Sequence, residues 1–163
     1  MPTNDWRERT ALLFGEKSIE TLSRSHVLVA GLGGVGGYAV EQLCRAGIGK
    51  LTLVDNDTIQ LSNINRQLIA HQNNVGECKA RSWTARCNAI NPHLQINTVN
   101  KYIDKETAPT LFEDKIDYVI DAIDTPSAQI AFYTKLHARQ RSIDKQHGGR
   151  RQERSIKNYG CPP

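Results

Sequence analysis

Glycines and a carboxylate in the first third of the chain have the spacing of a nucleotide-phosphate site. The sequence GLGGVGG places Gly31, Gly33 and Gly36 in the order G-x-G-x-x-G, after an apolar run and before an amphipathic segment. Such glycines permit a tight turn and let backbone N–H groups at a helix N-terminus approach a phosphate. Asp55 ends the next apolar run, where an acidic side chain suits the hydroxyl pair of a ribose. The pattern predicts nucleotide binding.

Two cations downstream favour a triphosphate over a dinucleotide. Arg66 in SNINRQ and Lys79 in VGECK both follow the second apolar run, at the expected phosphate end of the site. A helix N-terminus handles the pyrophosphate of a dinucleotide largely by itself. A triphosphate that reacts needs positive charge near its leaving group. Arg66 and Lys79 therefore favour ATP, and an NAD-dependent dehydrogenase is the alternative that preferential NAD binding would support.

These residues need alternating strands and helices to position them. Strands are predicted at apolar runs, at residues 26–32, 50–55, 94–100 and 116–124. Helices are predicted from residue 16, over about 35–46, over 77–90 and 105–114, and from residue 126. Strands that alternate with helices imply an α/β fold with a Rossmann-like, doubly wound, mostly parallel sheet, here truncated after the fourth strand. The polar stretch 56–76 is longer than an ordinary loop, which favours a functional role.

Length and composition restrict the class of protein. The 163 residues suffice for one domain and not for two of ordinary size. The chain has no run of about eighteen apolar residues, and its N-terminus MPTNDWRERT is charged, so we expect a cytoplasmic protein with no membrane partner. The four cysteines form no CxxC pair, so zinc is poorly supported and reduced, structural thiols are expected.

Four motifs together resemble a known enzyme superfamily. RTALLFGEKSIETL, HVLVAGLGGVGGYAVEQL with its continuation to SNINRQ, VGECKA and DYVIDAID occur in order from about residue 7 to residue 129. They resemble the ThiF-type adenylyltransferase domain of ubiquitin-activating enzymes, of the molybdopterin and thiamine sulfur-carrier activators, and of the bacterial tRNA threonylcarbamoyladenosine dehydratases. The opening motif and VIDAID are most similar to the dehydratase branch. Sulfur-carrier activators typically carry two CxxC zinc pairs farther along, which this chain does not show.

The resemblance implies activation of a carboxylate by ATP. An oxygen of the substrate carboxylate attacks the α-phosphorus, giving an acyl-adenylate and pyrophosphate. In the dehydratase branch the carboxylate belongs to the threonyl group of a modified tRNA adenosine, and internal attack then closes a ring and expels AMP. Activation of the C-terminus of a ubiquitin-like sulfur carrier is the alternative. A third possibility is an inactive nucleotide-binding fragment. The implied partners are tRNA or such a carrier, in a homodimer if the full domain is intact.

The resemblance also assigns expected roles to residues. Those expected to bind ATP are Gly31, Gly33, Gly34 and Gly36 at the α-phosphate and adenosine, Asp55 at the ribose, and Asn63, Arg66 and Lys79 at the phosphates. Asp124 is expected near Mg²⁺ and the triphosphate, and Arg9 matches an arginine that reaches the γ-phosphate of a partner subunit in dimeric relatives. Arg9, Arg66, Lys79 and Asp124 are the expected catalytic residues. Asp57 either takes part in the site or shapes its loop. Gly37 stands where dehydratases commonly have serine.

The last part of the chain has a different composition. Residues 135–163 hold 8 Lys and Arg against 2 Asp and Glu, whereas residues 1–134 hold 13 against 15. A basic run of this kind is either a phosphate-binding extension or a solvated face. A third reading comes from the genetic code. The codons of residues 145–155, read one nucleotide later, can spell SSMGAGGRSDP, which resembles a segment expected in this family, and those of residues 141–144 can spell VPLI.

We therefore expect a frameshift near residues 135–138. The expected organisation is an incomplete ThiF-type ATP-binding domain over residues 1–136 and a disordered or irregular basic tail over residues 137–163. On this reading the charge of the tail is no evidence for tRNA binding. The prediction that tRNA is a partner depends only on the resemblance of residues 7–129 to the dehydratases.

Overall fold

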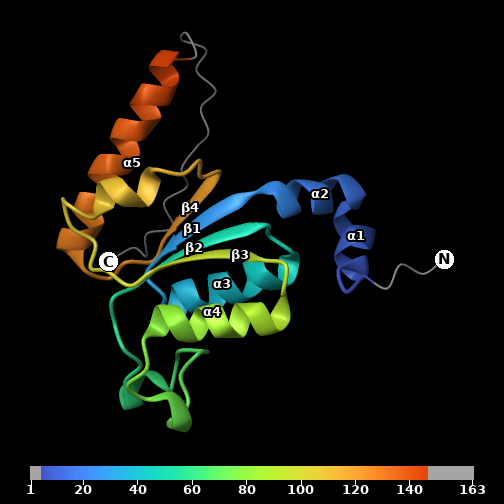
Figure 1. The fold of residues 1–163 in the computed structure, drawn as a ribbon, viewed down its shortest axis with the longest axis horizontal. Coiled ribbons are helices and arrows are strands. Elements are labelled where there is room, and N and C mark those ends of the chain that lie inside the picture. The colour runs from blue at the N-terminus through green and yellow to red at the C-terminus, as the bar shows by residue number, and fades with distance from the viewer. Residues whose placement is uncertain (1–4, 147–163) are drawn as a thin grey trace, which may run out of the picture.

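Four parallel strands form one sheet in the order β3-β2-β1-β4. The structure is a computed structural model that describes residues 5–146, with side chains described up to residue 138. The strands are β1 (His26–Ala30), β2 (Lys50–Val54), β3 (Gln95–Val99) and β4 (Tyr118–Asp121). The chain proceeds from β1 outward through β2 to β3, then crosses back to place β4 on the other side of β1 (Figure 1). This order is that of a doubly wound fold, as predicted.

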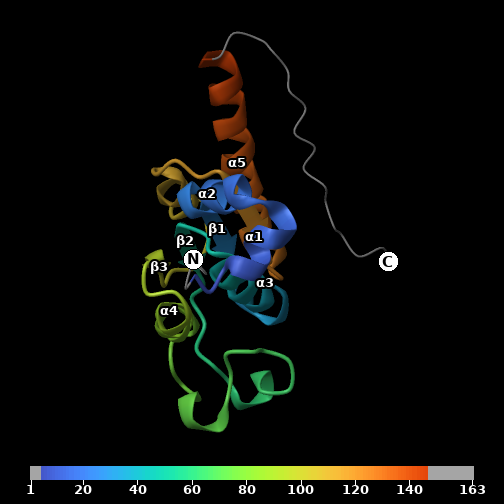
Figure 2. The same cartoon turned by 90° about the vertical axis from the view of Figure 1, so that its right-hand side faces the viewer.

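Helices cover both faces of the sheet. One face packs on α3 (Gly34–Ala46) and α4 (Lys79–Ile90), and the other on the 3₁₀ helix η3 (Ala108–Phe112) and on α5 (Pro126–Gln146) (Figures 1 and 2). At the N-terminus, α1 (Glu8–Phe14) and α2 (Glu16–Arg24) extend beyond the amino ends of the strands. Among the described residues, no helix combines the length and the apolar character needed to cross a membrane.

The strand residues alternate between two apolar cores. Val27 and Val29 of β1 belong to the core beneath α3 and α4, whereas Leu28 and Ala30 face the core beneath α5. All four residues are at most 3% exposed, as expected for a parallel sheet covered on both faces. Each large apolar side chain buried this way contributes about 1.5–3 kcal/mol to folding, so β1 is firmly anchored in the sheet. The glycine loop that follows β1 therefore starts from a fixed position.

Most predicted elements are confirmed, and the differences have physical causes. Gly47 ends α3 in the left-handed conformation, with φ 85°, as its position predicted. The segment 105–114 was expected to be a helix and contains only η3, because Pro109 lacks an N–H and the Asp104 carboxylate holds the preceding turn. The polar stretch 56–76 contains the 3₁₀ helices η1 (Leu61–Asn63) and η2 (Gln72–Asn74). Helix α1 was not predicted.

The predicted division of the chain at residues 136 and 137 falls inside a helix. α5 continues to Gln146, so residues 137–146 are helical instead of the irregular chain expected there. The prediction for residues 147–163 lies outside the described residues. The core on which α5 packs includes Ala128 and Phe132, which belong to its first two turns. The part of α5 that holds the fold together therefore lies before the predicted division.

Candidate active site

Most of the predicted site residues meet at the carboxyl ends of β1, β2 and β4. There the structure has a cavity of about 440 Å³. The sheet order changes direction between β1 and β4, and such a switch point is where ligands bind in open α/β sheets. The lining includes most residues expected to bind ATP, Gly31, Gly33, Gly34, Asp55, Arg66 and Lys79, and also Asp124, which was expected near Mg²⁺. A hollow of about 600 Å³ between residues 102–106 and α5 contains none of them.

The four glycines of the loop have two different structural roles. Gly31 has φ 85°, and a Cβ there would lie 2.4 Å from the Ala122 carbonyl oxygen. A Cβ on Gly36 would lie 1.8 Å from the Gly31 carbonyl oxygen. Gly36 is buried and is not among the residues that line the cavity, and its lack of a Cβ lets the start of α3 lie against the Gly31 carbonyl group. Gly33 and Gly34 have no atom this close and leave the start of α3 open to the cavity.

Asp55 fixes the conformation of the loop opposite the glycines. Its Oδ2 accepts a 2.7 Å hydrogen bond from the Leu32 N–H, and its Oδ1 accepts a 2.8 Å bond from the Asp57 N–H. Burial raises the pKa of the Asp55 carboxyl, while the two N–H donors act in the opposite direction. The carboxylate thus joins the loop after β2 to the glycine turn after β1. It lines the cavity where the predicted ribose contact would be made.

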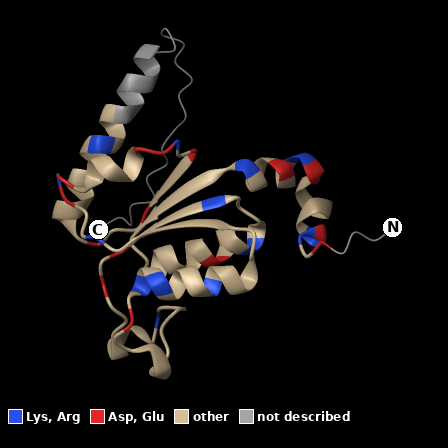
Figure 3. Cartoon of the chain, in the orientation of Figure 1, with Lys and Arg blue, Asp and Glu red and all other residues tan. Residues whose placement is uncertain are grey.

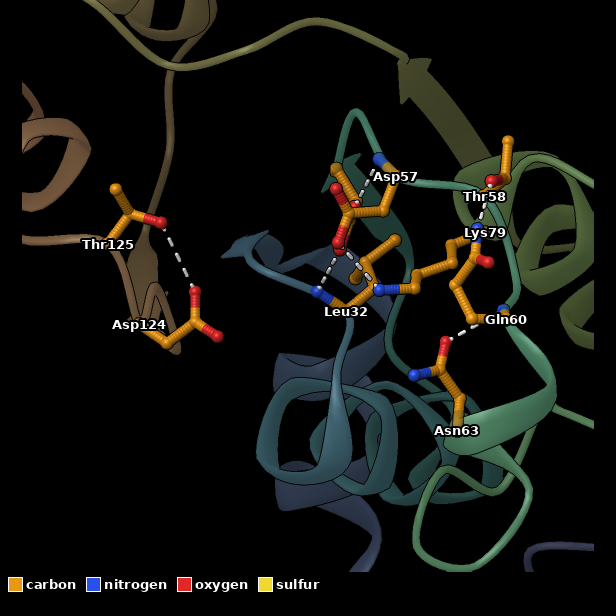
Figure 4. A network of polar contacts seen from close by, with 9 residues as sticks. Leu32, Asp57, Thr58, Gln60, Asn63, Lys79, Asp124 and Thr125 are labelled. Carbon is orange, nitrogen blue, oxygen red and sulfur yellow. Dashed lines mark hydrogen bonds and ion pairs between the residues drawn. The ribbon is translucent and has the colours of Figure 1, made fainter.

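Lys79, the first residue of α4, is a buried cation. It is 5% exposed, and its Nζ lies 2.8 Å from Oδ2 of Asp57, whose side chain is 60% exposed (Figure 4). The backbone N–H of Lys79 also donates to the Asp57 carbonyl oxygen, at 3.0 Å. Figure 3 shows the basic start of α4 close to the acidic loop that leaves β2. The ammonium group therefore sits at the cavity wall with one carboxylate as its counter-ion.

The SNINRQ motif divides into residues that shape the loop and residues that reach the cavity. Asn63 is buried, its Oδ1 accepts a 2.9 Å hydrogen bond from the Gln60 N–H, and it does not line the cavity (Figure 4). Arg66 is exposed and lines the cavity, and its Nη1 donates to the Ser62 carbonyl oxygen. Gln67 was not predicted, yet it lines the cavity, is 7% exposed, and its Oε1 has no partner among the described residues.

Asp124 and Arg9 lie at opposite ends of the molecule. Asp124 follows β4, lines the cavity, and accepts one long hydrogen bond, 3.4 Å, from the Thr125 hydroxyl (Figure 4). Its oxygens therefore remain able to bind a hard cation. Within the described part of the chain no three acidic, His or Cys side chains could hold a metal ion alone. A carboxylate with free oxygens at the cavity, such as that of Asp124, fits Mg²⁺, which is commonly held by one or two carboxylates and substrate phosphates. Arg9 lies on α1, beyond the amino ends of the strands.

Residues after β3 also line the cavity and had no signal in the motifs. Lys101, Tyr102 and Ile103 reach it because parallel strands deliver their carboxyl ends to the same edge of the sheet. The sequence gives them no distinctive spacing. Only the register of β3 beside β2 places them there.

The family follows from comparison of this chain with known proteins. A family model described as the ThiF family matches residues 7–143. The chain belongs to the ThiF family. The tRNA threonylcarbamoyladenosine dehydratase of Escherichia coli K12 is 38% identical over 135 residues, which are 80% of this chain and 50% of that protein. The Bacillus subtilis dehydratase is 42% identical over 117 residues, 72% of this chain and 46% of that protein.

Other ThiF-type proteins match over a shorter stretch. The molybdopterin-synthase adenylyltransferase of E. coli K12 is 41% identical over 105 residues, 64% of this chain and 42% of that protein. Among solved structures, the E. coli dehydratase in complex with ATP has a TM-score of 0.80 at 35% identity and covers 86% of this chain and 59% of that one. The same enzyme in complex with AMP gives the same score. The chain thus spans about half the length of the curated relatives it matches.

Proposed function

We propose that this ThiF-family chain provides the ATP site of an enzyme that adenylates a carboxylate. The observation that carries the proposal is one cavity in which the open start of α3 at Gly33 and Gly34 faces Lys79, Arg66 and Asp124. A nucleoside triphosphate needs these groups together: backbone N–H donors for one phosphate, cations for a leaving pyrophosphate, and a carboxylate for a metal. The dehydratase structure that contains ATP shares this fold.

Each group has a part in the proposed reaction. The first N–H groups of α3 hold the α-phosphate, while a substrate carboxylate oxygen forms a bond to the α-phosphorus and the bond to the pyrophosphate oxygen breaks. Lys79 and Arg66 stabilise the negative charge that develops on the departing pyrophosphate. Asp55 holds the ribose. Mg²⁺ bound at Asp124 would neutralise phosphate charge. The protein positions the reactants, and no side chain is needed as a nucleophile.

The substrate we propose is the threonylcarbamoyl group of a modified tRNA adenosine. Support comes from the dehydratases, which match 72–80% of this chain at 38–42% identity. In this reaction the adenylated carboxylate is attacked from within the same group, a ring closes and AMP leaves. ATP and tRNA share the cytoplasm, so the proposed reaction places the protein there.

A second candidate is activation of a ubiquitin-like sulfur carrier. It is favoured by the molybdopterin-synthase adenylyltransferase, which is 41% identical over 105 residues, 64% of this chain. Both reactions use the same ATP chemistry. The ATP site therefore does not distinguish the two substrates.

Exchange of labelled pyrophosphate into ATP tests these proposals. We expect exchange with the purified chain when tRNA carrying threonylcarbamoyladenosine is added, and none with unmodified tRNA. Exchange only with a carrier protein that ends in two glycines would support the second candidate. ATP binding without exchange for either substrate would identify the chain as a nucleotide-binding fragment. Lys79→Ala should abolish exchange and weaken ATP binding.

We also propose that Arg9 acts in a homodimer. α1 lies at the opposite end of the sheet from the cavity, so Arg9 is not placed to serve the nucleotide site of its own chain. The same helix exposes three consecutive apolar side chains, Leu12, Leu13 and Phe14, by 82%, 74% and 63%. Exposed apolar clusters of this kind mark interaction surfaces. We propose that a second copy covers them and that the cavity of that copy then lies within reach of this arginine.

A further inference from the structure

A buried lysine in a phosphate site must have a negative partner before ATP arrives. The Lys79 side chain is 6% exposed, and its ammonium contacts Asp57 at 2.8 Å. Moving an ammonium ion out of water without a counter-ion costs several kcal/mol, so the site without nucleotide depends on this carboxylate. The triphosphate that we propose for this cavity offers the same chemical group, an anionic oxygen, to the same cation.

Asp57 is held in place by its backbone. Its N–H donates to Oδ1 of Asp55 and its carbonyl oxygen accepts from the Lys79 N–H. The adjacent residue Thr58 pairs with Cys78 in an antiparallel bridge, which joins the loop after β2 to the start of α4. The carboxylate is thus delivered to the ammonium by a backbone that connects the expected ribose carboxylate to the expected phosphate lysine.

The two partners differ strongly in exposure. The Asp57 side chain is 60% exposed and the Lys79 side chain 6%. Rotation of the Asp57 carboxylate into water therefore costs little, whereas the ammonium group has no comparable access to solvent. When a phosphate oxygen enters, the carboxylate is the partner that leaves.

We propose that Asp57 is a positioning residue that occupies the place of a phosphate oxygen in the site without nucleotide. It holds Lys79 against the cavity wall and is exchanged for the triphosphate on binding. This inference rests on the proposed function, because it requires the cavity to accept a triphosphate. The inference predicts that Asp57 weakens ATP binding, although the residues around Asp57 favour ATP binding.

The test is ATP affinity of the full chain carrying Asp57→Asn, measured by calorimetry in EDTA. The variant removes the carboxylate in contact with Lys79, so a phosphate oxygen no longer competes with it for the ammonium group, and we expect ATP binding about three- to tenfold tighter than wild type. Adenosine has no phosphate and should bind both proteins equally. The variant without nucleotide should melt at lower temperature, and ATP should raise that temperature more than in wild type.

Asp114→Asn is the matched control. Asp114 pairs with Lys50 at 2.6 Å, outside the nucleotide cavity, and its replacement changes the net charge by the same amount. If Asp114→Asn tightens ATP binding equally, the effect is one of overall charge and the proposal is wrong. Asp57→Ser is a second variant that removes the carboxylate if Asp57→Asn does not fold, and the same tightening is expected.

Other outcomes also decide the matter. ATP binding that is weaker or unchanged in both Asp57 variants in EDTA overturns the proposal. If the variants lose ATP affinity only when Mg²⁺ is present, and bind no more tightly in EDTA, then Asp57 binds the metal ion. This result also overturns the proposal. Absence of ATP binding by the wild-type chain contradicts the proposed function itself. That failure is distinct, because it appears before any variant is compared.

Discussion

Gly33 and Gly36 lie three positions apart in one loop, yet an added methyl group would meet different surroundings at each. At Gly36 the new carbon would lie 1.8 Å from the carbonyl oxygen of Gly31, the residue that directly follows β1. At Gly33 the nearest atom would be Nε2 of Gln67, at 3.7 Å, an ordinary contact distance. One motif therefore contains a glycine for packing and a glycine for ligand approach.

Gly36→Ala is expected to disrupt the fold. The methyl group would push α3 away from β1, and we expect a loss of at least about 3 kcal/mol of unfolding free energy. Urea denaturation followed by circular dichroism measures this loss. A variant with wild-type stability would show that α3 does not pack against the Gly31 carbonyl as described.

Gly33→Ala is expected to remain folded and to lose ATP affinity. An added Cβ would meet no atom closer than Nε2 of Gln67 at 3.7 Å, so we expect a smaller loss of stability than for Gly36→Ala. The methyl group would occupy space at the start of α3, where a phosphate must approach the backbone N–H groups. Calorimetry should show ATP binding weakened by about tenfold or more. Unchanged ATP affinity in a folded variant would place the phosphates elsewhere.

At the scale of elements, Glu41 joins α3 to α4. Its carboxylate is 4% exposed and accepts hydrogen bonds from Arg86 through Nε at 2.7 Å and Nη2 at 2.9 Å, and from Arg45 of its own helix at 2.8 Å. The Arg86 guanidinium, and to a smaller extent that of Arg45, holds the pKa of Glu41 below its ordinary value of 4.5, against the effect of burial. The pair fixes α4, and with it Lys79, relative to the glycine loop at the start of α3.

Glu41→Gln should therefore make stability less sensitive to acid. Since the folded state lowers this pKa, the unfolded state binds more protons below pH 4.5, and the stabilisation is lost as the pH falls through the folded pKa. We expect the free energy of unfolding of wild type to exceed that of the variant by about 1–2 kcal/mol at pH 7. This difference should shrink below pH 4.5. Urea unfolding between about pH 3 and pH 7 measures it.

Glu20→Gln is the control for this experiment. Glu20 pairs with Arg24 on the exposed surface of α2, and pairs of that kind contribute about 0–1 kcal/mol. A difference between wild type and Glu41→Gln that stays constant down to pH 3 would contradict the role given to the carboxylate charge.

How much of these elements the sequence predicts depends on the kind of interaction. The strands and α3 follow from local pattern, because apolar runs, glycines and Gly47 each act within a few residues. Non-local contacts had no such signal. Asn63 matches a phosphate-binding motif but is buried, because its amide satisfies the Gln60 N–H. From the sequence, Asp57 could either take part in the site or shape its loop. Its contact is with Lys79, twenty-two residues later in the chain, and no local pattern indicates it.

At the scale of the whole molecule, the reading frame of the last part of the chain determines whether the sheet can continue beyond β4. The match to the ThiF family model ends at residue 143, and the described part of α5 ends at Gln146. In the described sheet β4 pairs only with β1, so its other edge presents unpaired backbone groups, which tend to recruit another strand. A frame that continued the family sequence after residue 138 would supply such a strand through the segment VPLI.

Sequencing of the gene and peptide mass mapping test the reading frame. We expect a one-nucleotide change near the codons of residues 135–138 that restores a segment close to SSMGAGGRSDP. The restored chain should be more soluble than the present one, because the exposed edge of β4 would be paired. One intact frame, with peptides that cover residues 136–163 as printed, would show that the basic segment is genuine.

Subunit mixing tests whether Arg9 completes the site of another copy. Arg9→Ala and Lys79→Ala should each be inactive alone in pyrophosphate exchange. In a mixed dimer, the Arg9→Ala chain keeps Lys79 and receives an intact arginine from the Lys79→Ala chain, so one of the two sites is whole. Random pairing of equal amounts then restores about a quarter of wild-type activity.

The control is Arg24→Ala, which replaces an exposed arginine on α2 and should keep full activity alone. If Arg9 served its own chain, mixing would restore nothing, since each chain would carry one defect in its only site. The position of α1 beyond the amino ends of the strands favours the first result.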